Sequence, residues 1–163
     1  MSWDTAIKST ELANYSVGQT WHTTPKGYFL VGQVRRKLEY PDLKRLIINE
    51  AEDQKARTIL IEDKGSGSSL IQDLNRLQWN HRRPEIIPIV PKDDKVMRMH
   101  AQTSKLEAGQ VFLPSRADWL DDFRSEVCAF PNGSNDDQVD AMSQYLQWED
   151  DRRSRFTHWA TAR

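Results

Sequence analysis

Cysteine is almost absent from this sequence, which contains only Cys128. A single cysteine excludes an internal disulfide and a cysteine-rich zinc site. Its neighbours in the sequence, Val127 and Ala129-Phe130, are apolar. We therefore expect Cys128 to be a buried thiol of the core rather than a catalytic nucleophile.

Long hydrophobic runs and a signal peptide are also missing. No apolar stretch approaches the roughly 20 residues that span a bilayer, and the first four residues lack the basic and apolar segments of a secretory signal. The 29% of charged and 37% of hydrophobic residues are typical of a soluble globular chain, and 163 residues suffice for one domain with a real core. We therefore expect one cytoplasmic domain over residues 1–163, with no membrane partner.

Neither sign of charge predominates, because 23 basic and 24 acidic residues leave a net charge of −1. This balance does not indicate a nucleic-acid-binding protein. It does not exclude one either, since a carboxylate cluster combined with local basic patches averages to the same value.

Several motifs of common enzymes are absent as well. The Gly65-Ser66-Gly67 turn lacks the Gly-x4-Gly-Lys-Ser/Thr spacing of a phosphate loop, which argues against ATP binding. Close packing beside an acidic strand end explains these glycines better. No Gly-x-Ser-x-Gly elbow occurs. The four histidines show no close metal-ligand spacing; they are His22, His81, His100 and His158.

The pattern of apolar residues predicts a mixed α/β fold. Strands are expected at residues 2–8, 15–22, 27–38, 58–61 and 86–90, with a short extended segment at 109–114. The first three should form an antiparallel meander, and Pro88 favours a sheet edge for the fifth. Helices are expected from Pro41, over 70–77, 92–107 and 119–130, and from Asp136 to about Arg153. We also expect a flexible turn at residues 64–69 and fraying from about residue 150.

Acidic residues occur at three places that such a fold brings together. They are Asp4 in the first strand, Glu62 and Asp63 at the end of a buried strand, and Asp136, Asp137 and Asp140 at the start of the last helix. In an open α/β sheet, strand ends and helix starts converge at one edge. Carboxylates gathered there repel one another unless cations neutralise them.

Oxygen ligands of this kind suit Mg²⁺ or Mn²⁺. Two such ions are the usual means of in-line phosphodiester cleavage. The sequence therefore predicts a two-metal site. Taken alone, the last acidic cluster also fits a surface helix start with an excess of capping carboxylates, because negative charge is favourable in the first turn of a helix.

Five motifs in a fixed order carry a family resemblance. They are Ser2-Trp3-Asp4-Thr5-Ala6; Ile61-Glu62-Asp63-Lys64 with Gly67 and Ser69-Leu70-Ile71; Lys95-Val96-x-Arg98; Gly109-x-Val111-x-Leu113-Pro114; and Asp136-Asp137-x-x-Asp140-Ala141. Together they resemble the C-terminal nuclease domain of the large terminase subunit of tailed bacteriophages and prophages, from residue 2 to about residue 147.

The resemblance implies a ribonuclease-H-like fold and a metal-dependent endonuclease that cuts concatemeric viral DNA during packaging in the bacterial host cell. Double-stranded DNA is the implied substrate. An ATPase motor domain, a small terminase subunit and a portal are the implied partners. The motor domain is absent from this chain, which begins just before its first motif, so we expect an excised domain or a truncated prophage gene that does not package DNA alone.

Position by position, the resemblance assigns the metal ligands. Asp4 matches the first-strand aspartate, Glu62 or Asp63 the second acid, and Asp137 or Asp140 the acid of the last helix, with Asp136 as a cap or outer ligand. The spacing to Gly67 favours Glu62. Because side chains alternate along a strand, Glu62 and Asp63 should point to opposite faces, and only one should bind metal directly.

Basic residues near these motifs are candidate DNA contacts. Lys64, Lys95 and Arg98 are the ones that we expect to hold phosphates, which carry little sequence information. Two alternatives stay open. One is a nuclease of the resolvase or transposase type with the same fold, and the other is a catalytically idle DNA-binding or docking module.

Overall fold

The computed structural model describes residues 1–6, 15–91 and 93–161. Within them, six strands form one sheet in the order β5-β4-β1-β2-β3-β6. The strands are β1 (Ser2–Asp4), β2 (Ser16–Thr24), β3 (Gly27–Arg36), β4 (Thr58–Glu62), β5 (Glu85–Ile89) and β6 (Val111–Phe112). The helices are α1 (Tyr40–Asp53), α2 (Ser66–Arg76), α3 (Lys95–His100), α4 (Thr103–Glu107), α5 (Leu120–Ala129) and α6 (Asp137–Thr161).

The sheet is mixed, as predicted. β1, β2 and β3 pair antiparallel in sequence order, which confirms the meander. β4 returns parallel to β1, and β5 pairs parallel to β4 at the edge of the sheet. Pro88 therefore lies in an edge strand, where a residue without an N–H group is tolerated. The first predicted strand included residues 7 and 8, which lie outside the described residues.

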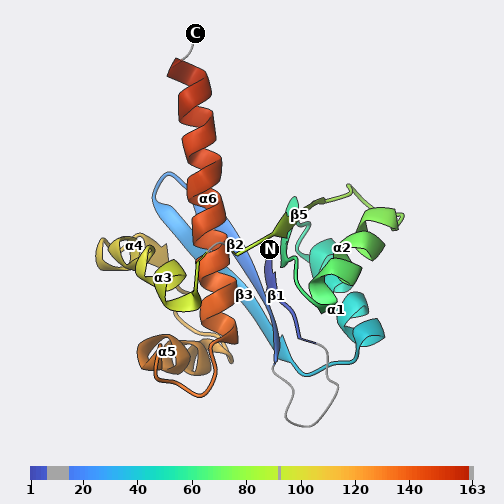
Figure 1. Ribbon diagram of the computed structural model, residues 1–163, viewed down its shortest axis with the longest axis horizontal. Coiled ribbons are helices and arrows are strands. Elements are labelled where there is room, and N and C mark those ends of the chain that lie inside the picture. Colours follow the sequence, from blue (N-terminus) through green and yellow to red (C-terminus); the bar gives the residue numbers. More distant parts are fainter. Residues whose placement is uncertain (7–14, 92, 162–163) are drawn as a thin grey trace.

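The two faces of the sheet bury different halves of the core. Trp3, Ile59 and Ile61 pack with apolar side chains of α1 and α2. On the opposite face, Trp21 and Leu60 pack in a second cluster that includes residues of α5 and α6. Figure 1 shows α6 crossing the sheet on the side that also carries α3, α4 and α5, with α1 and α2 on the other side. Since side chains alternate along a strand, the residues directly before and after Trp3 and Ile61 in the sequence face α6.

Two of the predicted helix boundaries are wrong. The segment 92–107 is not one helix within its described part, because α3 ends at His100 and α4 begins at Thr103. Between them Gln102 turns inward, where its Nε2 donates to Gln147 Oε1 of α6 at 3.0 Å. The turn expected at 64–69 is shorter than predicted, since α2 begins at Ser66.

Cys128 is exposed, so the expectation of a buried thiol is wrong. On α5, Phe123 and Glu126 face the interior, and Cys128, two residues after Glu126, lies on the opposite side of the helix.

Helix α6 continues to Thr161, beyond the point near residue 150 at which fraying was expected, and extends past the sheet in Figure 1. In the described part of the chain, no helix is long and apolar enough to cross a membrane.

Candidate active site

The carboxyl ends of two central parallel strands place two acidic residues side by side. β1 and β4 pair with Trp3 opposite Ile61, so the next residues along the two strands are Asp4 and Glu62. Trp3 and Ile61 are buried against α1 and α2. Because side chains alternate along a strand, Asp4 and Glu62 both point to the face that carries α6.

Helix α6 brings two more carboxylates to the same place. Gln144 Nε2 donates to Ser2 Oγ at 2.8 Å and to the backbone oxygen of Trp3 at 3.3 Å, which fixes the helix against β1. Asp140 lies about one turn before Gln144, and Asp137 about one turn earlier still. Both aspartates are buried, with 6% and 5% of their surface exposed respectively.

The protonation of Asp4 reflects this convergence. Burial raises the pKa of Asp4 to about 8, and the charges of Asp140, Asp137 and Glu62 contribute to the increase. Lys95 opposes it. Three segments that are distant in the sequence therefore place carboxylates close enough for their charges to repel one another, as the sequence predicted.

Asp137 lies near a cation of the sheet, Arg35. Burial, followed by the Glu126 carboxylate, raises the pKa of Asp137 to about 6, whereas Arg35 lowers it. Arg35 Nη2 lies 3.3 Å from Glu126 Oε2 and 4.0 Å from Asp137 Oδ2. Arg35 stands in the same row of the sheet as Asp4, because Val17 of β2 pairs with both residues.

Helix α3 supplies two cations to the start of α6. Lys95 Nζ lies 2.8 Å from Asp136 Oδ2 and 3.1 Å from Asp140 Oδ2. Arg98 Nη2 lies 2.6 Å from Asp140 Oδ1. Burial opposes the charge of Lys95, but the hydrogen bond to Asp136 and the charge of Asp140 raise the pKa of Lys95 above its ordinary value. Two of the predicted DNA contacts therefore neutralise aspartates in this structure.

Asp136 lies just outside the helix, as expected of a capping position. Its backbone oxygen accepts a hydrogen bond from the Asp140 N–H at 2.8 Å. Its side chain is about one-third exposed, at 35%, and contacts Lys95. Asp136 thus lies at the rim of the cluster, while Asp137 and Asp140 lie inside it.

Glu62 and Asp63 have separate surroundings. Glu62 acts on Asp4 through its charge. Asp63 is exposed, and its Oδ1 accepts a hydrogen bond from Ser68 Oγ at 2.6 Å. This placement agrees with the expectation, from strand alternation and from the spacing to Gly67, that Glu62 faces the cluster. Lys64 follows on the exposed turn before α2.

Glu126 and Arg35 were not among the site residues predicted from the sequence. Glu126 is only 8% exposed, and it accepts hydrogen bonds from the backbone N–H and from Nε2 of Gln138, each at 2.7 Å. A signal was present in the sequence, since Glu126 follows Phe123 by three residues on the apolar face of α5. A carboxylate on such a face requires a buried partner.

The donor set of the cluster suits a divalent cation. It consists of carboxylate oxygens alone, which Mg²⁺ and Mn²⁺ prefer, and the raised pKa of Asp4 shows that its charge is poorly compensated. As the side chains stand, however, no three histidine, cysteine, aspartate or glutamate residues of the described chain are grouped to hold a metal. Lys95 and Arg98 pair with Asp140 in this arrangement.

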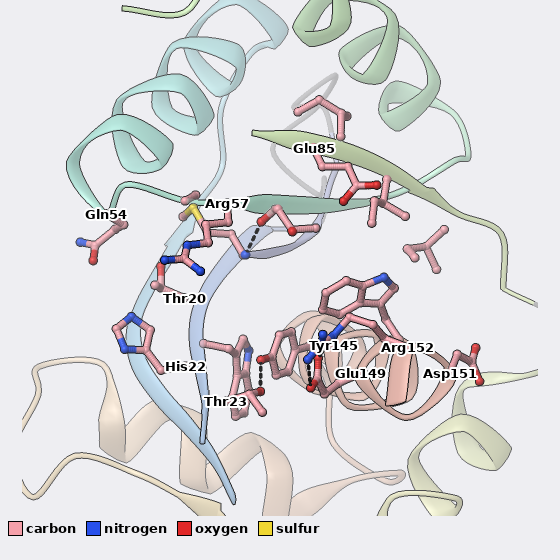
Figure 2. A pocket seen from close by; sticks show the side chains of 18 of the residues that line it. Thr20, His22, Thr23, Gln54, Arg57, Glu85, Tyr145, Glu149, Asp151 and Arg152 are labelled. Carbon is pink, nitrogen blue, oxygen red and sulfur yellow. Dashed lines mark hydrogen bonds and ion pairs between the residues drawn. The ribbon is translucent and has the colours of Figure 1, made fainter. Parts of the chain in front are cut away.

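A large groove of about 1380 Å³ lies at the opposite end of the strands. Its lining includes Thr58 and Glu85, which begin β4 and β5, and Tyr145 and Arg152 of α6. Figure 2 shows Glu85, Tyr145 and Arg152 around the groove. Asp4 and Glu62 end their strands, so the carboxylate cluster is a separate feature and the groove is not the candidate active site.

A mixed sheet that carries carboxylates at its central strand ends beneath a long final helix defines a ribonuclease-H-like α/β domain. The sequence matches the model of the Terminase RNaseH-like domain family over residues 1–148, and the chain belongs to this family. The resemblance drawn from the five motifs is thus confirmed.

A solved structure supports the same fold. The large terminase from a thermophilic bacteriophage superimposes with a TM-score of 0.64 at 14% sequence identity, over 90% of this chain and 38% of that one. The chain therefore spans well under half the length of that terminase. No curated protein matches the sequence.

Proposed function

We propose that the chain is the metal-dependent DNA endonuclease domain of a phage terminase large subunit. In that role it would cut concatemeric viral DNA during genome packaging. The observation that carries the proposal is the convergence of Asp4, Glu62, Asp137 and Asp140 on one volume, where burial and then the charges of the other three carboxylates raise the pKa of Asp4 to about 8. Uncompensated carboxylates at one edge of a sheet are a ready site for divalent cations.

In this proposal Asp4, at the centre of the cluster, would be shared by two Mg²⁺ or Mn²⁺ ions. Glu62 would help to hold one ion and Asp137 with Asp140 the other, while Asp136 would support them from the rim. Bound ions of this kind supply an activated water and stabilise the leaving oxygen. Because the pKa of Asp4 is raised, a cation bound there would favour its ionised form.

Lys64, Lys95 and Arg98 are the proposed contacts for DNA phosphates. Lys95 and Arg98 already lie on the carboxylate cluster, so a phosphate that reaches the cluster meets both cations. Double-stranded DNA is the proposed substrate in the host cytoplasm. In a complete packaging machine, an ATPase motor domain, the small terminase subunit and the portal are the proposed partners.

Plasmid cleavage with Mn²⁺ or Mg²⁺, with and without EDTA, tests the proposal. The unmodified chain should nick or linearise plasmid only when the metal is available. Asp4→Asn should abolish cleavage and leave the fold intact, because it removes a charge without removing volume. Equal cleavage by both proteins would refute the assignment. Salt-sensitive DNA binding without cleavage at any Mn²⁺ concentration would favour an idle docking module, and a strong preference for branched DNA would favour a resolvase-type nuclease.

A further inference from the structure

Glu126 caps helix α6 from a different element. The first N–H groups of a helix lack partners within it, and a side-chain acceptor usually satisfies one of them from the preceding turn. Here Glu126 Oε1, on α5, accepts the Gln138 N–H at 2.7 Å, and Glu126 Oε2 accepts from Gln138 Nε2 at 2.7 Å. Both oxygens of one buried carboxylate are thus used to fix the residue next to Asp137.

The opposite side of Gln138 is fixed by the sheet. Gln33 Nε2 of β3 donates to Gln138 Oε1 at 2.6 Å, and Gln19 Nε2 of β2 donates to the backbone oxygen of Gln138 at 3.0 Å. Gln138 has no exposed surface. A buried network in which each member is bonded favours one arrangement strongly, so the backbone at the start of α6 has little freedom.

Arg35 connects the same carboxylate to Asp137. Its Nη2 lies 3.3 Å from Glu126 Oε2 and 4.0 Å from Asp137 Oδ2, and its side chain is only 20% exposed. Arg35 Nη2 makes no hydrogen bond within the described residues. The charges of the two carboxylates act on Arg35, and its guanidinium also lies over the Tyr15 ring, 4.2 Å from the ring centroid. Arg35 therefore stands between the Glu126 and Asp137 carboxylates in charge.

We propose that Glu126 is a positioning residue, which with Arg35 holds the Asp137 carboxylate in place for a divalent cation. The inference depends on the proposed function, since it assumes that Asp137 binds metal. Groups that orient metal ligands commonly change metal affinity or activity by about 10- to 100-fold when they are replaced. Glu126 has the burial, the hydrogen bonds and the place next to a candidate ligand that such a group requires.

The test is calorimetric titration of Mn²⁺ into the chain without DNA, for the unmodified protein and for Glu126→Gln. Glutamine has only one acceptor oxygen and no charge, so it cannot make both bonds to Gln138 or hold Arg35. We expect Mn²⁺ to bind Glu126→Gln about 10- to 100-fold more weakly. In plasmid cleavage, the half-saturating Mn²⁺ concentration should rise by a similar factor, while the rate at saturating Mn²⁺ stays within about threefold.

Glu149→Gln is the matched control. Glu149 is also a buried glutamate, 1% exposed, but it lies about three turns beyond Asp137 along α6. It pairs with Arg152 and Arg153. Its replacement should lower stability without changing Mn²⁺ binding by more than about twofold. A merely structural role for Glu126 would make the two variants behave alike.

Glu126→Asp is the second variant, in case Glu126→Gln does not fold. Aspartate keeps the charge beside Arg35 but is one methylene too short to reach the Gln138 amide from the same backbone position, so weaker Mn²⁺ binding is expected here too. Wild-type Mn²⁺ binding by a folded Glu126 variant would overturn the positioning role. If the unmodified chain neither binds Mn²⁺ nor cleaves DNA, the proposed function itself fails.

Discussion

Gly67, in the first turn of α2, lies directly against the backbone oxygen of Glu62, so close that a Cβ atom at Gly67 would collide with it. Ile61, the residue before Glu62, lies next to the same position. The glycine therefore determines how closely α2 approaches the end of β4, where Glu62 leaves the sheet. This contact confirms the expectation of close packing for Gly67, but that expectation is wrong for Gly65, where an added Cβ would meet nothing within 4 Å and the positive φ of 56° favours glycine instead.

Gly67→Ala should accordingly destabilise the protein. The neighbour is backbone rather than a flexible side chain, so the helix or the strand end must shift. Overpacking of this kind typically costs about 1–3 kcal/mol, measurable as a lower free energy of unfolding in urea. Gly32→Ala is the control, because its added Cβ would meet only Thr20, at 3.6 Å. Equal stability of the two variants would contradict the packing role.

Glu62 and Asp63 should differ sharply in cleavage. Glu62 acts on Asp4, whereas Asp63 is exposed and bonded to Ser68. Glu62→Gln should reduce the rate by more than about 100-fold, above the effect of groups that only orient ligands. Asp63→Asn should stay within about threefold, since an amide oxygen still accepts the Ser68 hydroxyl. The reverse order of rates would assign the ligand to Asp63.

The pKa of Asp4 predicts a pH-dependent stability. Burial and three carboxylates raise this pKa from 3.8 to about 8. Between these pH values folded Asp4 holds a proton that it has lost in the unfolded chain, so the contribution of Asp4 to the free energy of unfolding falls as pH rises and levels off above about 8. In Asp4→Asn this fall in the free energy of unfolding is absent, because asparagine carries no carboxyl group at this position. Its advantage in stability over the unmodified chain should grow from about pH 4 to about pH 8 in metal-free buffer.

Urea unfolding of both proteins at several pH values measures the difference. EDTA is needed throughout, because a bound cation would stabilise the ionised form of Asp4 and mask the effect. A constant difference across the range would mean that Asp4 is not desolvated among like charges.

The strand ends of this site are predictable from the sequence, whereas the ion pairs of Lys95 and Arg98 with the aspartates are not. Apolar residues beside Asp4 and Glu62 mark buried strands, and strand alternation orients both carboxylates. The pairing of Arg98 with Asp140 joins residues 42 positions apart, and no local pattern encodes it. The bond between Gln102 and Gln147 that accompanies the end of α3 joins residues 45 positions apart. Local periodicity describes elements, whereas these contacts depend on how α6 packs.

The Lys95 ammonium pairs with the carboxylates of both Asp136 and Asp140, and its charge there opposes a metal ion. Its removal should therefore strengthen metal binding. Its Nζ lies 2.8 Å and 3.1 Å from their carboxylates. In Lys95→Met the two charges lose this partner, so Mn²⁺ should bind about tenfold more tightly, equivalent to about 1.4 kcal/mol. DNA binding should weaken at the same time, because a phosphate contact is lost.

Lys105→Met is the matched control for this last experiment. Lys105 pairs with Asp150, which is also on α6, about 15 Å along the helix from Asp140 by the rise of 1.5 Å per residue. Its replacement removes an equal charge and a similar ion pair, but no cation from the cluster. If Lys95→Met and Lys105→Met bind Mn²⁺ equally, Lys95 does not compete with metal. Tighter binding in Lys95→Met alone would show that the Lys95 charge opposes a cation at the cluster.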